Sequence, residues 1–174
     1  MHLRYVPLPG GDAAIKHPAR IALAWLWSLG IDWNEDLPAA RDLEPIHLET
    51  LLQQLKHGVN VSLTSSMGRL FDTAASLAGV RQRVNYEAQA AIEFEALADP
   101  AELGAYRLEI AGSEIDTAPA LHAMLDDIRK AVPTSTLAAR FHNGIAAMVE
   151  EAVIRIRQDS GLQTRRRGFE SLRP

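Results

Sequence analysis

The sequence contains no cysteine, which excludes several kinds of chemistry at once. Without a thiol there is no disulfide framework, no thiolate nucleophile and no zinc site of the cysteine-rich kind. Long apolar runs are also missing. No stretch approaches the roughly 18 apolar residues of a membrane-spanning helix, and the first residues lack the apolar run of a signal peptide. We therefore expect a cytoplasmic protein with no membrane partner.

The excess of charge of one sign is small. The 174 residues include 18 Lys and Arg against 22 Asp and Glu, a net charge of −4, and four of the arginines lie in residues 165–174. The rest of the chain is therefore more acidic than the total, which is a poor match to a phosphate backbone. Nucleic acid is not an expected partner. With 47% apolar residues, we expect one packed domain rather than a disordered chain.

Hydrophobic periodicity predicts a mainly helical fold. Apolar residues recur every three or four positions in six segments, and Pro or Gly bounds several of them. The expected helices cover about residues 18–29, 47–57, 67–78, 87–98, 118–131 and 135–158. Thr64, Ser65 and Ser66 precede the third of these and supply hydroxyls suited to cap its first N–H groups.

Strand signals are few. Tyr106, Leu108 and Ile110 alternate with polar residues, and a turn at Ala111–Gly112 returns the chain through Glu114–Ile115 as a short hairpin. The expected fold class is therefore mainly α with a short β-hairpin, an α+β arrangement.

Two segments are candidates for contact with a ligand. Leu8–Asp12 contains Gly10 and Gly11 and is predicted to be a tight, exposed turn, which either approaches a ligand or simply joins two elements. At Thr64–Gly68, the free N–H groups of a helix start form an anion pocket, and Gly68 allows close approach. A plain helix cap is the alternative reading of the second segment.

Acidic and amide side chains follow these segments. They are suited to hold ribose hydroxyls or an amide, although solvated surface residues explain them equally: Asp72, Glu87, Gln89 and Glu93. The six histidines include no i, i+4 pair with an acid between them, so no metal site is expected within this chain. His142, beside Asn143 on a predicted helix, is read as an ordinary hydrogen-bonding residue rather than a ligand.

Four segments taken together resemble the HypF family of hydrogenase-maturation carbamoyltransferases. In the order of the chain they read LPGGDAAI at 8–15, TSSMGRLFD at 64–72, YEAQAAIE at 86–93 and ARFHN at 139–143. The resemblance covers about residues 3–164. It implies part of the TsaD-like C-terminal domain of that family, namely the helical portion of the second lobe of an actin/Hsp70-like, ribonuclease H-like, two-lobed nucleotide-binding fold.

The resemblance also implies a set of nucleotide-binding residues. They are carried over from the matching motif positions: Gly10, Gly11, Asp12, Ser65, Ser66, Gly68, Asp72, Glu87, Gln89 and Glu93. It identifies no catalytic residue. Ala88 departs from the family pattern, which usually has Gly there, and its methyl group narrows the approach of a ligand or requires an unusual backbone conformation.

By resemblance, the parent protein uses carbamoyl phosphate and ATP to form a carbamoyl-adenylate. The carbamoyl group then passes to the C-terminal cysteine of HypE during maturation of nickel–iron hydrogenase. The family's other domains, with their zinc and iron sites, are absent from this chain. Because the domain positions substrates, orientation and charge stabilisation are expected to dominate over side-chain acid–base chemistry.

Residues 165–174 do not match the family and are expected to be a disordered tail. Arg165, Arg166 and Arg167 stand where the family has a buried strand, and three cations there would carry a large desolvation cost. We therefore expect a truncated or frame-shifted reading frame with little turnover by itself. Two other functions remain open: a non-catalytic helical interaction module, and a threonylcarbamoyl-transferring TsaD relative that acts on tRNA.

Overall fold

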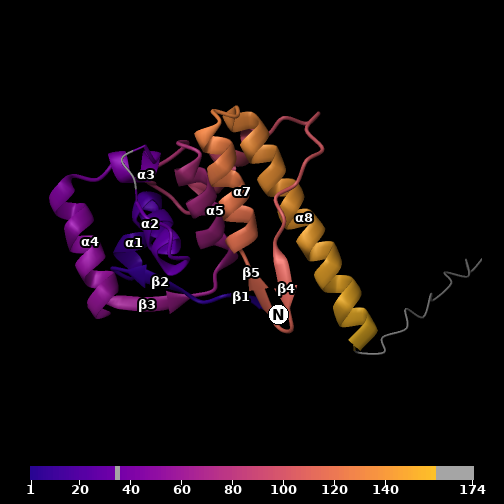
Figure 1. The fold of residues 1–174 in the computed structure, drawn as a ribbon, viewed down its shortest axis with the longest axis horizontal. Helices are drawn as coiled ribbons and strands as arrows, with labels where there is room; N and C mark the ends of the chain where they lie inside the picture. Colours follow the sequence, from indigo (N-terminus) through magenta and orange to yellow (C-terminus); the bar gives the residue numbers. More distant parts are fainter. Residues whose placement is uncertain (34–35, 160–174) are drawn as a thin grey trace, which may run out of the picture.

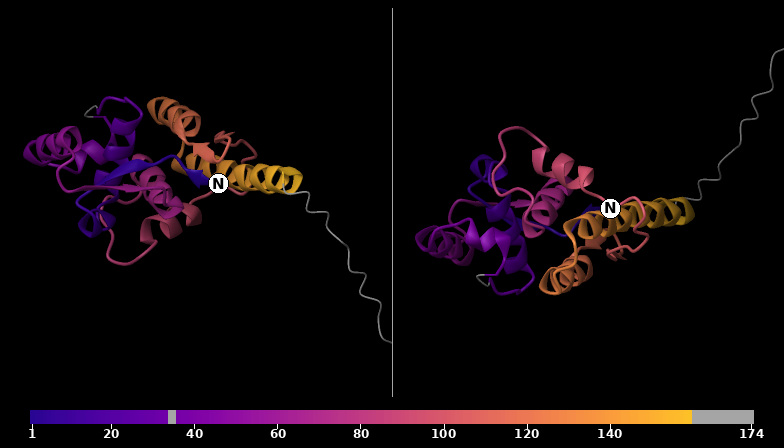
Figure 2. Two further views of the ribbon diagram at one scale, coloured as in Figure 1. Left: turned by 90° about the horizontal axis from the view of Figure 1, so that it is seen from below. Right: turned by 90° about the horizontal axis from the view of Figure 1, so that it is seen from above.

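The computed structural model describes residues 1–33 and 36–159. Helices pack around two small sheets (Figure 1), and the C-terminal half of the longest helix projects beyond the rest (Figure 2). The helices are α1 (Asp12–Ile15), α2 (Pro18–Ser28), α3 (Pro38–Arg41), α4 (Pro45–His57), α5 (Met67–Leu77), α6 (Gln89–Ala96), α7 (Ala118–Arg129) and α8 (Thr134–Asp159). The strands are β1 (His2–Leu3), β2 (Val6–Pro9), β3 (Val61–Thr64), β4 (Glu109–Ala111) and β5 (Glu114–Asp116).

The two sheets join distant parts of the chain. In one, with strand order β1-β5-β4, the predicted hairpin pairs Ile110 with Ile115, and β1 lies parallel to β5 with Leu3 opposite Ile115. In the other, β2 lies antiparallel to β3, with Val6 opposite Thr64. The N-terminal residues therefore tie together the two ends of the described fold.

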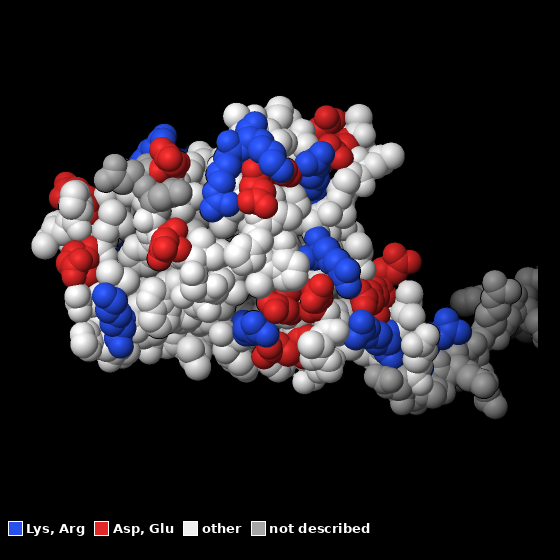
Figure 3. Space-filling model, in the orientation of Figure 1, with Lys and Arg blue, Asp and Glu red and all other residues white. Residues whose placement is uncertain are grey.

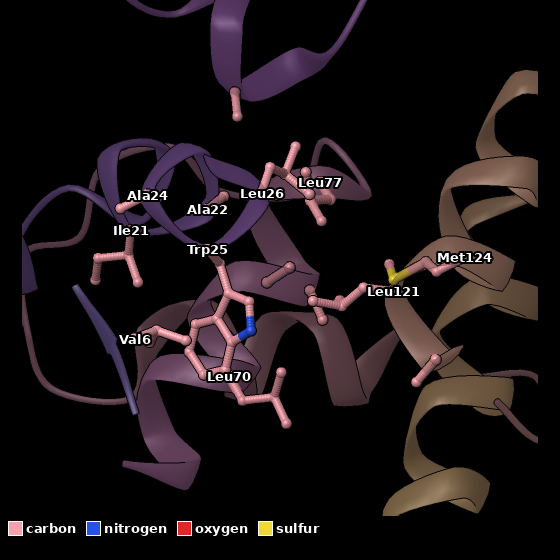
Figure 4. Packing of buried hydrophobic residues seen from close by; sticks show 14 of the residues in the cluster. Val6, Ile21, Ala22, Ala24, Trp25, Leu26, Leu70, Leu77, Leu121 and Met124 are labelled. Atoms are coloured by element: carbon pink, nitrogen blue, oxygen red, sulfur yellow. The ribbon is translucent and has the colours of Figure 1, made fainter. Parts of the chain in front are cut away.

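The centre of the core lies where α2 crosses α5. Eight of the eleven residues of α2 are buried, as expected for a helix near the centre of a core, and Pro18 occupies its first turn, where no N–H donor is needed. Trp25 is completely buried and extends its ring from α2 toward Val6 and Leu70 (Figure 4). Its Nε1–H donates to Thr117 Oγ1 at 2.9 Å, so the one polar atom of the indole is satisfied.

A segment without regular structure is held against α8. The Tyr106 N–H donates to the Arg140 carbonyl at 2.9 Å, and Asn143 Nδ2 donates to the carbonyls of Glu102 and Gly104 at 3.0 and 2.9 Å. The phenol of Tyr106 donates to Asp127 of α7 at 2.8 Å. Burial, followed by this bond to a carboxylate, raises the pKa of Tyr106. Residues 102–106 thus connect α7 with α8.

The structure confirms the expected fold class and most of the helices. The predictions for residues 18–29, 118–131 and 135–158 agree with α2, α7 and α8 to within two residues, while α4 begins at Pro45 and α6 at Gln89.

The prediction that Leu8–Asp12 is a tight exposed turn is wrong in its first half. Leu8 and Pro9 are buried in β2, and the turn itself is confined to Gly10 and Gly11, whose φ values are +94° and +52°. The prediction of a single hairpin also missed β1, β2 and β3. These strands are too short to show alternation, and prolines within β2 disguise it.

Charges of both signs are interspersed on the surface. On the face seen in Figure 3, Lys and Arg lie among Asp and Glu without an extended field of one sign. Arg4 illustrates the pattern, because it pairs with Glu114 at 2.9 Å and Asp116 at 3.3 Å. Within the described part of the chain, no helix combines the length and apolar character needed to cross a bilayer. The prediction for residues 165–174 lies outside the described residues.

Candidate functional site

A cavity of about 280 Å³ lies between the first turns of α5 and the segment that opens α6. Its lining comes from two of the motifs in the sequence: Met67, Gly68, Arg69, Phe71, Asp72, Glu87, Ala88 and Ala91. Contact between α5 and α6 brings these motifs together although about fifteen residues separate them along the chain. We refer to this cavity as the α5–α6 pocket.

A larger cavity elsewhere does not contain the motif residues. It measures about 580 Å³ and lies against α3 and α4, where Trp33, Leu43 and Leu52 form part of a largely apolar wall. The size of a cavity does not by itself indicate chemistry, which requires convergent polar groups. The smaller α5–α6 pocket has them, so it is the candidate functional site.

The N-terminus of α5 presents free donors to the α5–α6 pocket. Ser66 is the N-cap residue but makes no side-chain cap bond, and the hydroxyl of Thr64 instead accepts from the Ser66 N–H at 3.1 Å. The expectation that these hydroxyls cap the N–H groups in the first turn of α5 is therefore wrong. The N–H groups of Met67 and Gly68 have no acceptor within the helix. Together with the helix dipole, they favour an anionic group.

A buried ion pair forms part of the pocket wall. Arg69 Nη1 lies 2.9 Å from Asp72 Oδ2, and the two side chains are only 13% and 4% exposed. Burial raises the pKa of Asp72, while the charge of Arg69 opposes that shift. The charge of Arg69 therefore offsets part, but not all, of the desolvation that favours the neutral acid at this position.

Ala88 adopts a conformation that normally favours glycine. Its φ is +61° and its ψ is 8°, in the left-handed region, and it is the N-cap residue of α6. Glu87 and Ala88 both line the pocket, so this strained position lies in the pocket wall. The two consequences expected from the sequence, a methyl group at the pocket and an unusual dihedral, occur together.

Ala88→Gly is expected to stabilise the fold by about 1 kcal/mol, because glycine adopts a positive φ without the strain of a Cβ. Ala131→Gly is the matched control, since Ala131 also has a positive φ of +55° but follows α7, away from the α5–α6 pocket. Urea unfolding should show a similar gain for both variants. A loss of stability in Ala88→Gly would contradict the strain at this position.

A polar network fixes the segment that leads into α6. Arg81 donates two hydrogen bonds of 2.7 Å to Glu93, Gln89 donates to Glu93 at 2.9 Å, and the Asn85 N–H donates to Gln89 Oε1 at 2.8 Å. The bond from Arg81, followed by that from Gln89, lowers the pKa of Glu93. The network therefore fixes the path of residues 85–89, which includes the pocket residues Glu87 and Ala88.

Comparison with known proteins agrees with the motifs. The family model described as "Carbamoyltransferase, Kae1-like Domain, second subdomain" matches residues 1–165. The chain belongs to the HypF carbamoyltransferase family. Its expected class, a helical part of an actin-like or ribonuclease H-like lobe, is confirmed by this match and by solved HypF structures.

Curated HypF proteins match nearly the whole chain. It is 31% identical to Carbamoyltransferase HypF2 of Cupriavidus necator over 94% of its length, and 33% identical to Carbamoyltransferase HypF of Synechocystis sp. over 93%. In both comparisons it spans 23% of the relative. The chain therefore corresponds to about a quarter of these HypF proteins.

Two solved HypF structures share the fold. A full-length HypF crystallised in a phosphate- and nucleotide-bound form superposes with a TM-score of 0.84 at 32% identity, covering 92% of this chain and 25% of that one. HypF of T. kodakarensis gives a TM-score of 0.78 at 24% identity, with 92% and 22% coverage. The second comparison supports the fold alone.

The HypF-derived site residues fall into three groups. Gly68, Asp72 and Glu87 line the α5–α6 pocket, whereas Gln89 and Glu93 belong to the supporting network. Four others are not among the residues that line the pocket: Ser65 and Ser66 precede α5, and Gly10 and Gly11 lie between β2 and α1. Asp12 is the first residue of α1.

Sequence reasoning missed two arginines of the candidate site. Arg69 lies inside a quoted motif, and its i, i+3 spacing to Asp72 was the available signal. The partnership of Arg81 with Glu93 spans twelve positions and carries no such local signal. In residues 1–33 and 36–159, no group of three or more His, Asp or Glu side chains is arranged to hold a metal ion.

Proposed function

We propose that this chain forms one wall of the nucleotide cleft of a HypF-type carbamoyltransferase in the cytoplasm. The observation that carries the proposal is the α5–α6 pocket, in which a free helix N-terminus and a buried ion pair meet the acidic residue Glu87. Donors at the helix start suit a phosphate group, and Glu87 suits ribose hydroxyls as an acceptor.

The size of the pocket supports a shared cleft. Pockets that enclose a drug-sized ligand measure roughly 300–1,000 Å³. At about 280 Å³, the α5–α6 pocket falls just below that range, so it accommodates only part of ATP. The remaining wall of the cleft is then supplied by the other lobe of the domain, in agreement with the 23% of the relatives' length that this chain spans.

In the proposed reaction, carbamoyl phosphate and ATP are the substrates from which a carbamoyl-adenylate is formed, with release of inorganic phosphate from the first and pyrophosphate from the second. The C-terminal cysteine thiolate of HypE attacks the carbamoyl carbon, a C–S bond forms, and the C–O bond to the adenylate phosphate breaks as AMP leaves with the electron pair. The residues of this chain hold and orient the adenylate, which contributes to rate by positioning and by stabilising charge on the leaving phosphate.

Titration of the 174-residue chain with ATP tests this function. We expect weak binding with a raised melting midpoint, because a ligand selective for the folded state stabilises it, and little turnover without the second lobe. Gly68→Trp should weaken binding by about tenfold or more, since the indole fills the pocket. Leu103→Trp is the matched control, because Leu103 is 90% exposed and lies outside the pocket.

An interaction module is the second candidate. It is favoured by an apolar row along the projecting half of α8, where Val149, Val153 and Ile154 are about half exposed or more. Such a surface is typical of a docking face. Self-association with no response to ATP would support this function over the first. Salt-dependent binding of tRNA would instead indicate a threonylcarbamoyl-transferring relative.

A further inference from the structure

The sheet formed by β2 and β3 has a hydrogen-bonding pattern that can be read residue by residue. The Gly10 N–H donates to the Asn60 carbonyl at 2.8 Å, immediately beyond the paired strands. Hydrogen-bonded and non-hydrogen-bonded pairs alternate along an antiparallel ladder. Leu8 and Ser62, two positions further along the ladder, therefore also form a hydrogen-bonded pair. Pro9 and Val61, the pair between these two, do not.

Prolines remove the outward N–H donors from the β2 edge of this sheet, whereas the β3 edge is open. Pro7 pairs with Leu63 and Pro9 with Val61, at the positions that make no hydrogen bonds between the strands. On β2, the outward positions therefore belong to residues that lack an N–H donor. On β3, the N–H and C=O groups of Val61 and Leu63 point outward, so this edge offers hydrogen-bond donors as well as acceptors.

The open edge of β3 carries neither a charged residue nor a proline. Edge strands are commonly guarded by charged residues or proline, yet β3 reads Val-Ser-Leu-Thr, and Leu63 is 68% exposed. Within the described residues, no backbone hydrogen bond reaches the outward groups of Val61 or Leu63. Such an edge is a template for an added strand.

The strand β3 ends close, along the chain, to the helix that lines the α5–α6 pocket. Only Ser65 and Ser66 separate the end of β3 from α5, whose first turn lines the pocket. In Figure 1 the chain runs from the tip of β3 into α5. A strand added parallel to β3 would run from Val61 toward Thr64 and bring its C-terminal end to the pocket. An antiparallel strand would bring its N-terminal end there instead.

We propose that the edge of β3 binds the extended C-terminal tail of the carbamoyl acceptor as an added parallel strand. The inference rests on the proposed function for the identity of the tail, whose terminal thiol must reach the adenylate. Main-chain hydrogen bonds to Val61 and Leu63 supply the binding, and alternate apolar side chains of the tail pack beside Leu63.

Leu63→Pro tests the edge specifically. Proline removes the outward N–H and places a ring on the open edge, whereas the bonds from β3 to β2 come from Ser62 and Thr64 and are retained. Leu63→Thr is the matched control because it keeps the amide. The probe is a fluorescent peptide of the last ten residues of a HypE protein, with its terminal Cys replaced by Ser, measured by anisotropy with and without ATP.

We expect Leu63→Pro to weaken peptide binding by about tenfold or more, and Leu63→Thr to weaken it much less. Affinity for ATP should be the same in both variants. Hydrogen exchange of the unaltered chain provides a measurement that needs no variant. The amides of Val61 and Leu63 should exchange fast in the free chain and slow with peptide, whereas Ser62 is protected in both states.

The outcomes separate this inference from the proposed function. ATP binding without peptide binding, equal peptide affinity in Leu63→Pro, or a dimer of the chain that Leu63→Pro dissolves would each overturn the inference and leave the nucleotide site in place. Peptide binding at the edge without ATP binding would support the docking edge and refute the nucleotide cleft. Binding of neither ligand would overturn both.

Discussion

Gly144→Ala is expected to lower the free energy of unfolding by about 3 kcal/mol, in the upper range for an overpacked core position. A Cβ at Gly144 would overlap the carbonyl oxygen of Tyr106 and lie 3.0 Å from its carbonyl carbon. These are backbone atoms, held by the bond from the Tyr106 N–H to Arg140 and by the bonds from Asn143. The better helix propensity of alanine, worth about 1 kcal/mol, offsets only part of this cost.

Urea unfolding of Gly144→Ala should be compared with that of Gly68→Ala. Gly68 also lies in a helix, but a Cβ there would meet only Ser66 Oγ at 3.6 Å, an ordinary van der Waals contact. We expect Gly68→Ala to be as stable as the original chain or slightly more stable. If Gly144→Ala unfolds at the same urea concentration as Gly68→Ala, residues 102–106 do not pack against α8 as described.

The role of Gly144 shows where sequence reasoning ends. The apolar stripe of α8 is visible as periodicity, because a helix places every third or fourth residue on one face. The need for glycine at 144 depends on Tyr106, which lies 38 positions away in a segment with no regular structure. His142, expected to be an ordinary hydrogen-bonding residue, meets that expectation at one ring nitrogen only. Its Nδ1–H donates to the Ala138 carbonyl at 2.7 Å, whereas its Nε2 is buried without a hydrogen-bond partner among the described residues.

The strand β2 shows a different limit. Pro7 and Pro9 are turn formers by local propensity, and the sequence was accordingly read as a turn at its end. Both prolines lie at positions where the partner strand needs no donor, so the sheet tolerates them. Whether a proline of β2 falls on a position without a hydrogen bond depends on the register with β3. That strand lies more than fifty residues along the chain, so local patterns do not encode the register.

The candidate site was predictable in part because its motifs are contiguous. Gly68 and Asp72 share one helix and one quoted motif, so a resemblance was sufficient to select both. The support given by Arg81 to Glu93 is a tertiary contact and appears only in the structure. The pairing of Arg69 with Asp72 is local, but its energetic weight comes from burial, which the sequence does not show.

Arg69→Met is expected to destabilise the chain by about 3 kcal/mol at neutral pH, because removing one partner of a buried ion pair leaves the other charge uncompensated. Asp72 is 4% exposed as a side chain, and burial already raises its pKa against the opposing charge of Arg69. Without Arg69 the pKa of Asp72 rises further. The folded chain then holds a proton that the unfolded chain has released.

The pH dependence of that loss identifies its cause. A carboxyl whose pKa is raised by folding disfavours the native state increasingly as the pH rises from about 4, where an unfolded aspartate ionises, through the folded pKa. The deficit of Arg69→Met relative to the original chain should therefore be small near pH 4 and larger at pH 7. In Arg69→Met/Asp72→Asn there is no buried carboxylate, so most of the stability should return without pH dependence. An equal deficit at both pH values would mean that Arg69 stabilises the wall through packing of its alkyl chain rather than through Asp72.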